Sequence, residues 1–136
     1  MYIPLLLKRK NTASCWFTLQ VSIILTGSNE VEYETEAIID TGASITVIPP
    51  EISDLLELEE DKEISKMKLI TASGIIEVSR KIVKEVRINN KTFKNINVAI
   101  HQLPDPIEIK VLTGMNLIER MRLIIDGKKK EFDIDA

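Results

Sequence analysis

The sequence predicts an all-β domain with one or two short helices. Hydrophobic residues make up 44% of the chain and aromatic residues only 4%, so the core must be built mainly from Ile, Leu and Val. A bias towards β-branched residues favours strands. Several segments alternate apolar and polar residues, which is typical of strands with one buried face. Because no linker or low-complexity stretch divides the 136 residues, we expect one domain over residues 1–136.

The first two strands are expected to pair as a hairpin. Residues 16–25 alternate apolar and polar side chains, with Ile24 as the exception, and residues 27–29 supply a turn. In residues 31–37, apolar side chains alternate with glutamates. This row of glutamates could attract a metal ion or a basic partner, but the simpler interpretation is the solvated face of a sheet.

A short helix is expected to open at residues 49–51. Proline suits the first turn, and Glu51 complements the helix dipole. Residues 57–61 would then carry the chain into solvent. The apolar stripe of this helix would consist of Ile52, Leu55 and Leu56.

Four more strands are expected in the middle of the chain. Residues 66–76 predict a hairpin with residues 71–74 near its tip. Residues 78–88 and 93–100 predict two further strands, joined at Asn89-Asn90, which tolerates a left-handed backbone.

The last part of the chain predicts three strands and a second short helix. Residues 107–112 form the first of these strands, and the helix spans residues 116–120. Residues 122–126 and 131–135 follow, with a turn at Gly127. One side of the helix would carry Leu117, Ile118 and Met121.

The charge and hydropathy patterns argue against nucleic acid and membranes as partners. Net charge is −3 with acidic and basic residues mixed, and the basic cluster at residues 128–130 is expected to be a charged turn. The apolar residues 1–7 precede the basic residues 8–10, the reverse of a secretory signal, and no run approaches the ~20 apolar residues of a membrane span. Cys15 is the only cysteine, so no intrachain disulfide can form. We expect a soluble, cytoplasmic protein.

One segment, residues 37–45, is a candidate for chemistry. Its apolar residues lead to Asp40, which is followed at once by Thr41 and Gly42. A carboxylate placed where a strand leaves the core is partly desolvated, and glycine lets the backbone turn sharply beside a ligand. Taken alone, the Asp-Thr-Gly triplet also fits a strand-to-turn junction in which the aspartate caps the loop.

Residues 38–45 resemble the signature of the retropepsin-like aspartic proteases, in which two apolar residues precede Asp-Thr-Gly-Ala and an apolar stretch follows. Residues 111–118 match the family's second signature, which is an apolar pair, a glycine and a short helix. The resemblance covers about residues 16–134. It implies a closed β-barrel of the acid protease fold. It also implies an aspartic endopeptidase that hydrolyses extended peptide or protein substrates and uses neither metal nor cofactor.

The same resemblance implies a homodimer. When the two signatures are aligned with each other, Leu112 stands where Asp40 stands, and no other aspartate precedes Thr-Gly or Ser-Gly. The chemistry of the family needs two carboxylates, so a two-fold contact would join one Asp40 from each subunit. Apolar residues 2–5 and 132–134 would interleave across the interface, and their edges would be unpaired in a lone subunit.

The resemblance also assigns roles to individual residues. Asp40 would be catalytic, and Thr41 and Gly42 would support the active site and lock the dimer. A flap would span residues 68–76, although an ordinary hairpin turn fits the same segment. The substrate would be bound by Gly42, Ala43, Ser44, Thr71, Ala72, Ser73 and Gly74.

The chain departs from the viral pattern at two places. Viral members pair an acidic residue, four positions after the catalytic aspartate, with an arginine directly after the C-terminal glycine; these positions hold Ser44 and Met115. Their joint loss is consistent, because a lone buried charge would be costly. Gly74 is the only glycine of the expected flap, so a stiffer or shorter flap is predicted. The first of these departures is closer to the cellular single-domain members.

Two other functions fit the sequence less well. The first is a hydrolase that uses His101 or Cys15, but no other residues stand at the spacing that such an enzyme family requires. His101 is better explained as an exposed or capping residue, and Cys15 as a small buried residue. A non-catalytic dimeric binding or assembly module would keep the barrel without the chemistry. The intact run from Asp40 to Ala43 favours the enzyme, because a scaffold has no use for a costly pair of carboxylates.

Overall fold

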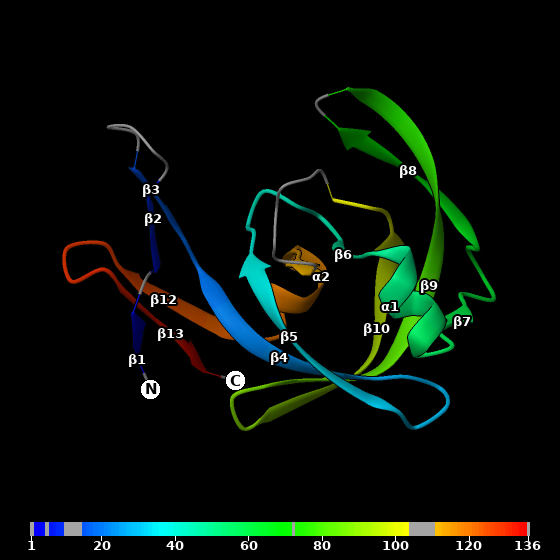
Figure 1. The fold of residues 1–136 in the computed structure, drawn as a ribbon, viewed down its shortest axis with the longest axis horizontal. Helices are drawn as coiled ribbons and strands as arrows, with labels where there is room; N and C mark the ends of the chain where they lie inside the picture. The colour runs from blue at the N-terminus through cyan, green and yellow to red at the C-terminus, as the bar shows by residue number, and fades with distance from the viewer. Residues whose placement is uncertain (1, 5, 10–14, 72, 104–110, 136) are drawn as a thin grey trace.

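The computed structural model describes residues 2–4, 6–9, 15–71, 73–103 and 111–135, and most of them lie in β-strands (Figure 1). The strands are β1 (Tyr2–Pro4), β2 (Leu6–Arg9), β3 (Cys15–Thr18), β4 (Gln20–Thr26), β5 (Glu32–Ile39), β6 (Thr46–Ile48), β7 (Glu59–Glu60), β8 (Lys66–Thr71), β9 (Gly74–Ile88), β10 (Lys91–Ile100), β11 (Val111–Thr113), β12 (Arg122–Asp126) and β13 (Glu131–Asp135). The helices are α1 (Pro50–Leu55) and α2 (Met115–Ile118).

Six of these strands close into a barrel. Strands β10, β6, β11, β5, β4 and β9 are hydrogen-bonded neighbours in that order, and β9 pairs back with β10. Strand β5 is parallel to β11, and β6 is parallel to β10. Closure removes the free edges that an open sheet would expose. The predicted all-β fold with a closed barrel and short helices is confirmed.

The interior of the barrel is aliphatic, as the composition predicted. The main cluster of buried side chains draws on most of the barrel strands and on both helices. Burial of this apolar surface is the main favourable term in folding. Its fully or nearly fully buried members include Ile23, Leu25, Ala37, Ile48, Leu56, Val83, Ile88, Val98, Val111, Leu117 and Phe132.

The predicted first hairpin is present, but residues 16–25 form two strands instead of one. The chain leaves strand geometry at Leu19, so that β3 pairs with β2 while β4 pairs with β5. The carbonyl of Leu19 still accepts a 2.8 Å hydrogen bond from the amide of Ile39. The glutamates of β5 are all exposed, which confirms the solvated face of the sheet.

Helix α1 opens at the predicted prolines, but its buried face was predicted only in part. Ile52 and Leu56 are 2% and 0% exposed, whereas Leu55 is 50% exposed. The expectation that residues 57–61 run into solvent holds only in part: the three glutamates are exposed, but Leu58 and Asp61 are buried. The cause is β7, which pairs with β9 and draws these residues against the sheet.

The predicted hairpin of residues 66–76 belongs to a longer arm. Strand β9 runs unbroken from Gly74 to Ile88, so the two segments predicted on either side of residue 77 are one strand. In residues 74–78, β9 pairs with β8 alone among the described strands. We call residues 66–78 the arm; it projects beyond the barrel at the top right of Figure 1.

The C-terminal part agrees with the predicted elements, with one correction. The predicted strand over residues 107–112 falls mostly outside the described residues, and α2 begins one residue earlier than expected. Strand β13 lies between β1 and β12 in a three-stranded sheet, and its side chains Phe132 and Ile134 are buried within the same chain. The expectation that residues 132–134 have unpaired edges in a lone subunit was therefore wrong. The chain itself supplies both neighbours.

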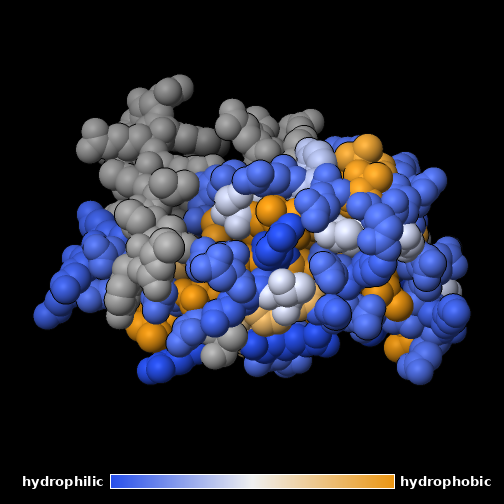
Figure 2. Space-filling model, turned by 90° about the horizontal axis from the view of Figure 1, so that it is seen from below, coloured by the Kyte–Doolittle hydropathy of each residue, from blue (hydrophilic) through white to orange (hydrophobic). Residues whose placement is uncertain are grey.

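The surface is largely polar. Figure 2 shows one face of the molecule on which hydrophobic residues form separate patches among hydrophilic ones. Neither α1 nor α2, the helices in the described part of the chain, is long and apolar enough to cross a bilayer.

Candidate active site

The carboxyl group of Asp40 lies where β5 ends. Ala37 and Ile39 anchor the end of the strand in the core, and Asp40 itself is half-buried. Its amide donates a 2.9 Å hydrogen bond to the carbonyl of Thr113 on β11. The strand-to-turn junction predicted from the sequence is therefore present, and the neighbouring strand fixes its position.

The loop after Asp40 folds back on that residue. The Gly42 amide donates a 2.8 Å hydrogen bond to Asp40 Oδ1, and the Ala43 amide donates a 3.2 Å hydrogen bond to the Asp40 carbonyl. A Cβ atom on residue 42 would lie 3.2 Å from Asp40 Oδ1, tighter than most such contacts. Glycine at this position therefore lets the loop close around the carboxylate.

Asp40 lines a cleft of about 560 Å³ between the barrel and the arm. The loop contributes Gly42, Ala43 and Ser44, and the arm contributes Thr71. Much of the rest is aliphatic. A mostly apolar cleft with a few convergent polar groups is typical of ligand sites. The aliphatic lining consists of Ile45, Val47, Leu69, Ile70, Leu103 and Leu112.

The inner face of the arm packs on the barrel beside this cleft. Val78 is buried, and Met67, Leu69 and Ile76 pack against a cluster that includes Ile45 and Val47. The arm is more exposed near its tip: the register partners Ile70 and Ile75 are 87% and 68% exposed, although Ile70 also borders the cleft.

The tip of the arm is a tight hairpin turn. The Thr71 hydroxyl donates a 2.9 Å hydrogen bond to the Gly74 carbonyl and accepts one of 3.2 Å from the Ser73 amide. Gly74 has a φ of +120°, a conformation that side chains with a Cβ rarely adopt. Ser73 and Gly74 are exposed and do not line the cleft, and Ala72 lies outside the described residues.

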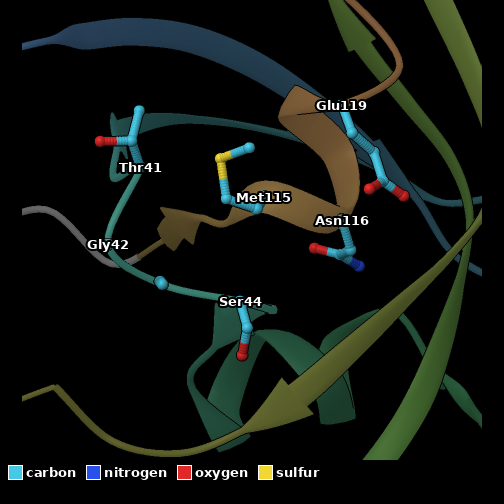
Figure 3. A pocket seen from close by; sticks show the side chains of 7 residues that line it. Thr41, Gly42, Ser44, Met115, Asn116 and Glu119 are labelled. Atoms are coloured by element: carbon cyan, nitrogen blue, oxygen red, sulfur yellow. The ribbon is translucent and has the colours of Figure 1, made fainter.

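A second hollow lies beside the loop that follows Asp40 (Figure 3). It is open, about 480 Å³ in volume, and is lined by the loop and by α2. Thr41 is exposed here and does not line the first cleft. Ser44 and Met115, the positions that depart from the viral pattern, both line this hollow, so they are neighbours in space even without a charge pair.

The second signature supports the loop after Asp40 through backbone hydrogen bonds. The amides of Met115 and Asn116 donate to the carbonyls of Ala43 and Ser44 at 2.7 and 3.2 Å. A Cβ on Gly114 would lie 2.4 Å from the carbonyl carbon of Ile45, so this close approach requires glycine.

Sequence reasoning missed the polar residues that complete this support. Asn116 Oδ1 accepts from the amide and the hydroxyl of Thr46 at 2.9 and 3.0 Å. The hydroxyl of Thr46, which is 2% exposed, in turn accepts a 3.1 Å hydrogen bond from the Gly114 amide. In the sequence, the one indication of this supporting role was the asparagine directly before the apolar pair Leu117 and Ile118.

His101 also has a position that differs from the expectation. It was expected at an exposed strand end or in a capping role, but it is half-buried and lines the cleft together with Asp40. Its amide donates a 3.0 Å hydrogen bond to the Ile48 carbonyl. Cys15 was predicted to be buried, but its side chain is not among those that the structure describes. Within the described residues, no three His, Cys, Asp or Glu side chains gather as metal ligands would.

Comparison with known proteins agrees with this geometry. The family model of the gag-polyprotein putative aspartyl protease matches residues 29–120, which include Asp40 and Asn116. The chain belongs to this family. No curated protein matches it.

The aspartyl protease fold is also found in solved structures. One is the crystal structure of a retropepsin-like aspartic protease from Rickettsia conorii, with 26% identity and a TM-score of 0.58, covering 85% of this chain and 88% of that one. Another is EIAV protease complexed with the inhibitor HBY-793, with 12% identity and a TM-score of 0.57, covering 83% of this chain and 93% of the other. The retropepsin-like fold implied by the two sequence signatures is confirmed.

Proposed function

We propose that the chain is an aspartic endopeptidase acting on extended peptides, and that its active site is assembled from the Asp40 residues of two copies. The observation that carries the proposal is the setting of Asp40 in an apolar cleft, with one oxygen held by the Gly42 amide. Among the described residues that line this cleft, Asp40 is the only carboxylic acid. A two-fold homodimer would supply the second one.

Two carboxyl groups at such a site would divide the work. Two carboxylates about 3 Å apart cannot both ionise comfortably, so the pair shares one proton, as is established for aspartic proteases. The ionised Asp40 would take a proton from a water molecule lying between the pair. The protonated Asp40 would polarise the scissile carbonyl and then pass a proton to the leaving nitrogen.

The neighbouring residues would position the partners. Thr41, exposed beside the second hollow, would bond across the two-fold axis and hold the two loops together. Gly42, Ala43 and Ser44 would bind the peptide as an added strand along the loop. From the arm, Thr71 lines the cleft, while Ala72, Ser73 and Gly74 would reach the peptide when the arm closes.

The dimer contact would use surfaces that remain exposed in one copy. The open hollow beside Thr41 presents Met115, which is 37% exposed. An uncharged Ser44 and Met115 would give a contact with no ion pair there, in contrast to the viral pattern described above.

The substitution Asp40→Asn tests the proposal. The wild-type protein is expected to cleave members of a mixed peptide library, and Asp40→Asn is expected to lose cleavage while keeping its dimer and its unfolding midpoint. An amide keeps the shape of the side chain but cannot act as a base. Asp54→Asn is a matched control, because Asp54 is exposed on α1 and does not line the cleft.

Two outcomes would count against the enzyme. Undiminished cleavage by Asp40→Asn would show that the carboxylate is not catalytic. Peptide binding by both proteins with no cleavage by either would favour the non-catalytic binding module.

A further inference from the structure

On strand β9, the arm joins the barrel at Ser79 and Arg80. Up to Val78, β9 pairs only with β8 among the described strands, whereas from Ser79 onward it pairs with β10. Isolated two-stranded ribbons are marginally stable in water. The direction of the arm therefore depends on how this junction is held, as well as on the packing of its inner face.

Arg80 is tied to the loop that leads into β8. Its amide donates to the Ser65 carbonyl at 2.8 Å, and its carbonyl accepts from the Asp61 amide at 3.0 Å. The Arg80 Nε atom lies 3.0 Å from Asp61 Oδ2, but without the alignment of a hydrogen bond, so this contact is an ion pair. The two side chains are only 23% and 11% exposed, so solvent screens the pair less than it screens a surface salt bridge.

Asn97 on β10 joins this pair to the barrel. With its amide oriented to match donors with acceptors, Asn97 donates to Asp61 Oδ2 at 3.3 Å and accepts from the Arg80 guanidinium at 2.9 Å. The backbone carbonyl of Asn97 accepts a 2.7 Å hydrogen bond from Asn116 Nδ2. Asn116 is the residue that holds Thr46 and the Ser44 carbonyl under the catalytic loop.

A continuous set of polar contacts thus connects the base of the arm to the loop of Asp40. We propose that Asp61, Arg80 and Asn97 are positioning residues that set the arm relative to the catalytic loop, so that it closes over the peptide in one alignment. This inference rests on the proposed function, because closure over a peptide is part of it. None of the three residues lines the cleft, so they would act through the arm and through Asn116.

The electrostatics of Asp61 suit this role. The backbone amides of Glu63 and Ile64 donate to its carboxylate, and together with the Arg80 guanidinium they hold the pKa of Asp61 below its usual range. The ion pair at the base of the arm therefore stays charged as the medium becomes acidic.

The substitution Asn97→Ala is the primary test, because it breaks the connection without leaving a charge unpaired. Hydrogen exchange is expected to accelerate in the arm and to stay unchanged in β4 and β5. The value of kcat/KM for a peptide that spans the cleft is expected to fall about five- to tenfold, mostly through KM, as for one lost hydrogen bond. Thr92→Ala, an exposed change on the same strand, is the control and is expected to alter neither quantity.

The ion pair is tested with a second matched pair of variants. Asp61→Asn is expected to act in the same direction as Asn97→Ala, and the double variant is expected to lose less than the product of the two single effects, because the three residues form one unit. The control is Glu30→Gln. It removes the charge of the exposed carboxylate that pairs with Lys84, a residue on β9 like Arg80.

The two proposals fail in different ways. Unchanged hydrogen exchange in the arm of both Asn97→Ala and Asp61→Asn would overturn the positioning role, whatever the activity. Equal acceleration in the arm and in the barrel would also overturn it, because the residues would then only stabilise the whole fold. Absence of cleavage by the wild-type protein would instead overturn the proposed function, while the exchange experiment would still decide whether the contacts hold the arm.

Discussion

At the scale of single residues, the loop around Asp40 holds its own carboxylate. The Gly42 amide occupies Oδ1, and the Thr113 carbonyl fixes the backbone of Asp40 from the neighbouring strand. A group held in this way loses little further freedom when it reacts, which is the advantage of a preorganised site. The side chain of Thr41, the residue after Asp40, is exposed beside the second hollow.

The exposed position of Thr41 leads to a prediction about its hydroxyl. If this group bonds across the proposed dimer axis, Thr41→Ala is expected to weaken dimerisation about five- to tenfold, the effect of about 1 kcal/mol. Thr41→Ser keeps the hydroxyl and is expected to stay close to the wild type. Sedimentation over a concentration series measures both dissociation constants, and equal constants for the two variants would show that the hydroxyl makes no such bond.

The residues of the site could be predicted from the sequence only where a motif marks them. Asp40, Thr41 and Gly42 are consecutive, so their pattern was visible, and residues 111–118 repeat it in part. Asn116 and Thr46 are 70 positions apart and meet only because β6 and α2 lie next to each other in the fold. Asp61, Arg80 and Asn97 likewise come from three separate elements, and no local spacing connects them.

At the scale of elements, strand alternation was predicted well and the breaks between elements less well. The exposed glutamates of β5 and the final hairpin of β12 and β13 are as expected. Strand β9 was divided at residue 77 because the pattern of a hairpin and the pattern of a long strand overlap there. The stripe of α1 was predicted too wide, because Leu55 is exposed and Leu58, the residue directly before β7, is buried in the core.

The tip of the arm gives a prediction with a built-in control. A Cβ at Gly74 or at Gly127 would meet no atom within 4 Å, but only Gly74 has a positive φ, +120°. Gly74→Ala is therefore expected to strain the tip by about 1 kcal/mol or more. Gly127→Ala is expected to be neutral or to stabilise by up to about 1 kcal/mol.

Hydrogen exchange in the arm and the midpoint of chemical unfolding measure these two effects. Faster exchange in the arm is expected for Gly74→Ala alone. If the two variants behaved alike, the backbone conformation of residue 74 would not be what shapes the tip.

At the scale of the whole molecule, one chain completes its fold but, on our proposal, only half of its active site. The barrel closes on itself, and β13 finds both of its neighbours within the chain. Strand β13 therefore needs no strand from a partner to complete its pairing. The cleft is different: on our proposal, its chemistry depends on a second Asp40.

Mixing wild-type protein with Asp40→Asn tests this central claim most directly. The two proteins are combined in equal amounts, incubated until subunits have exchanged, and assayed at fixed total concentration. If each active site needs two Asp40 carboxyls, only dimers of two wild-type chains cleave, and the mixture is expected to show about one quarter of the wild-type rate. A rate of about one half would mean that each chain carries a complete site of its own, and the shared site would be contradicted.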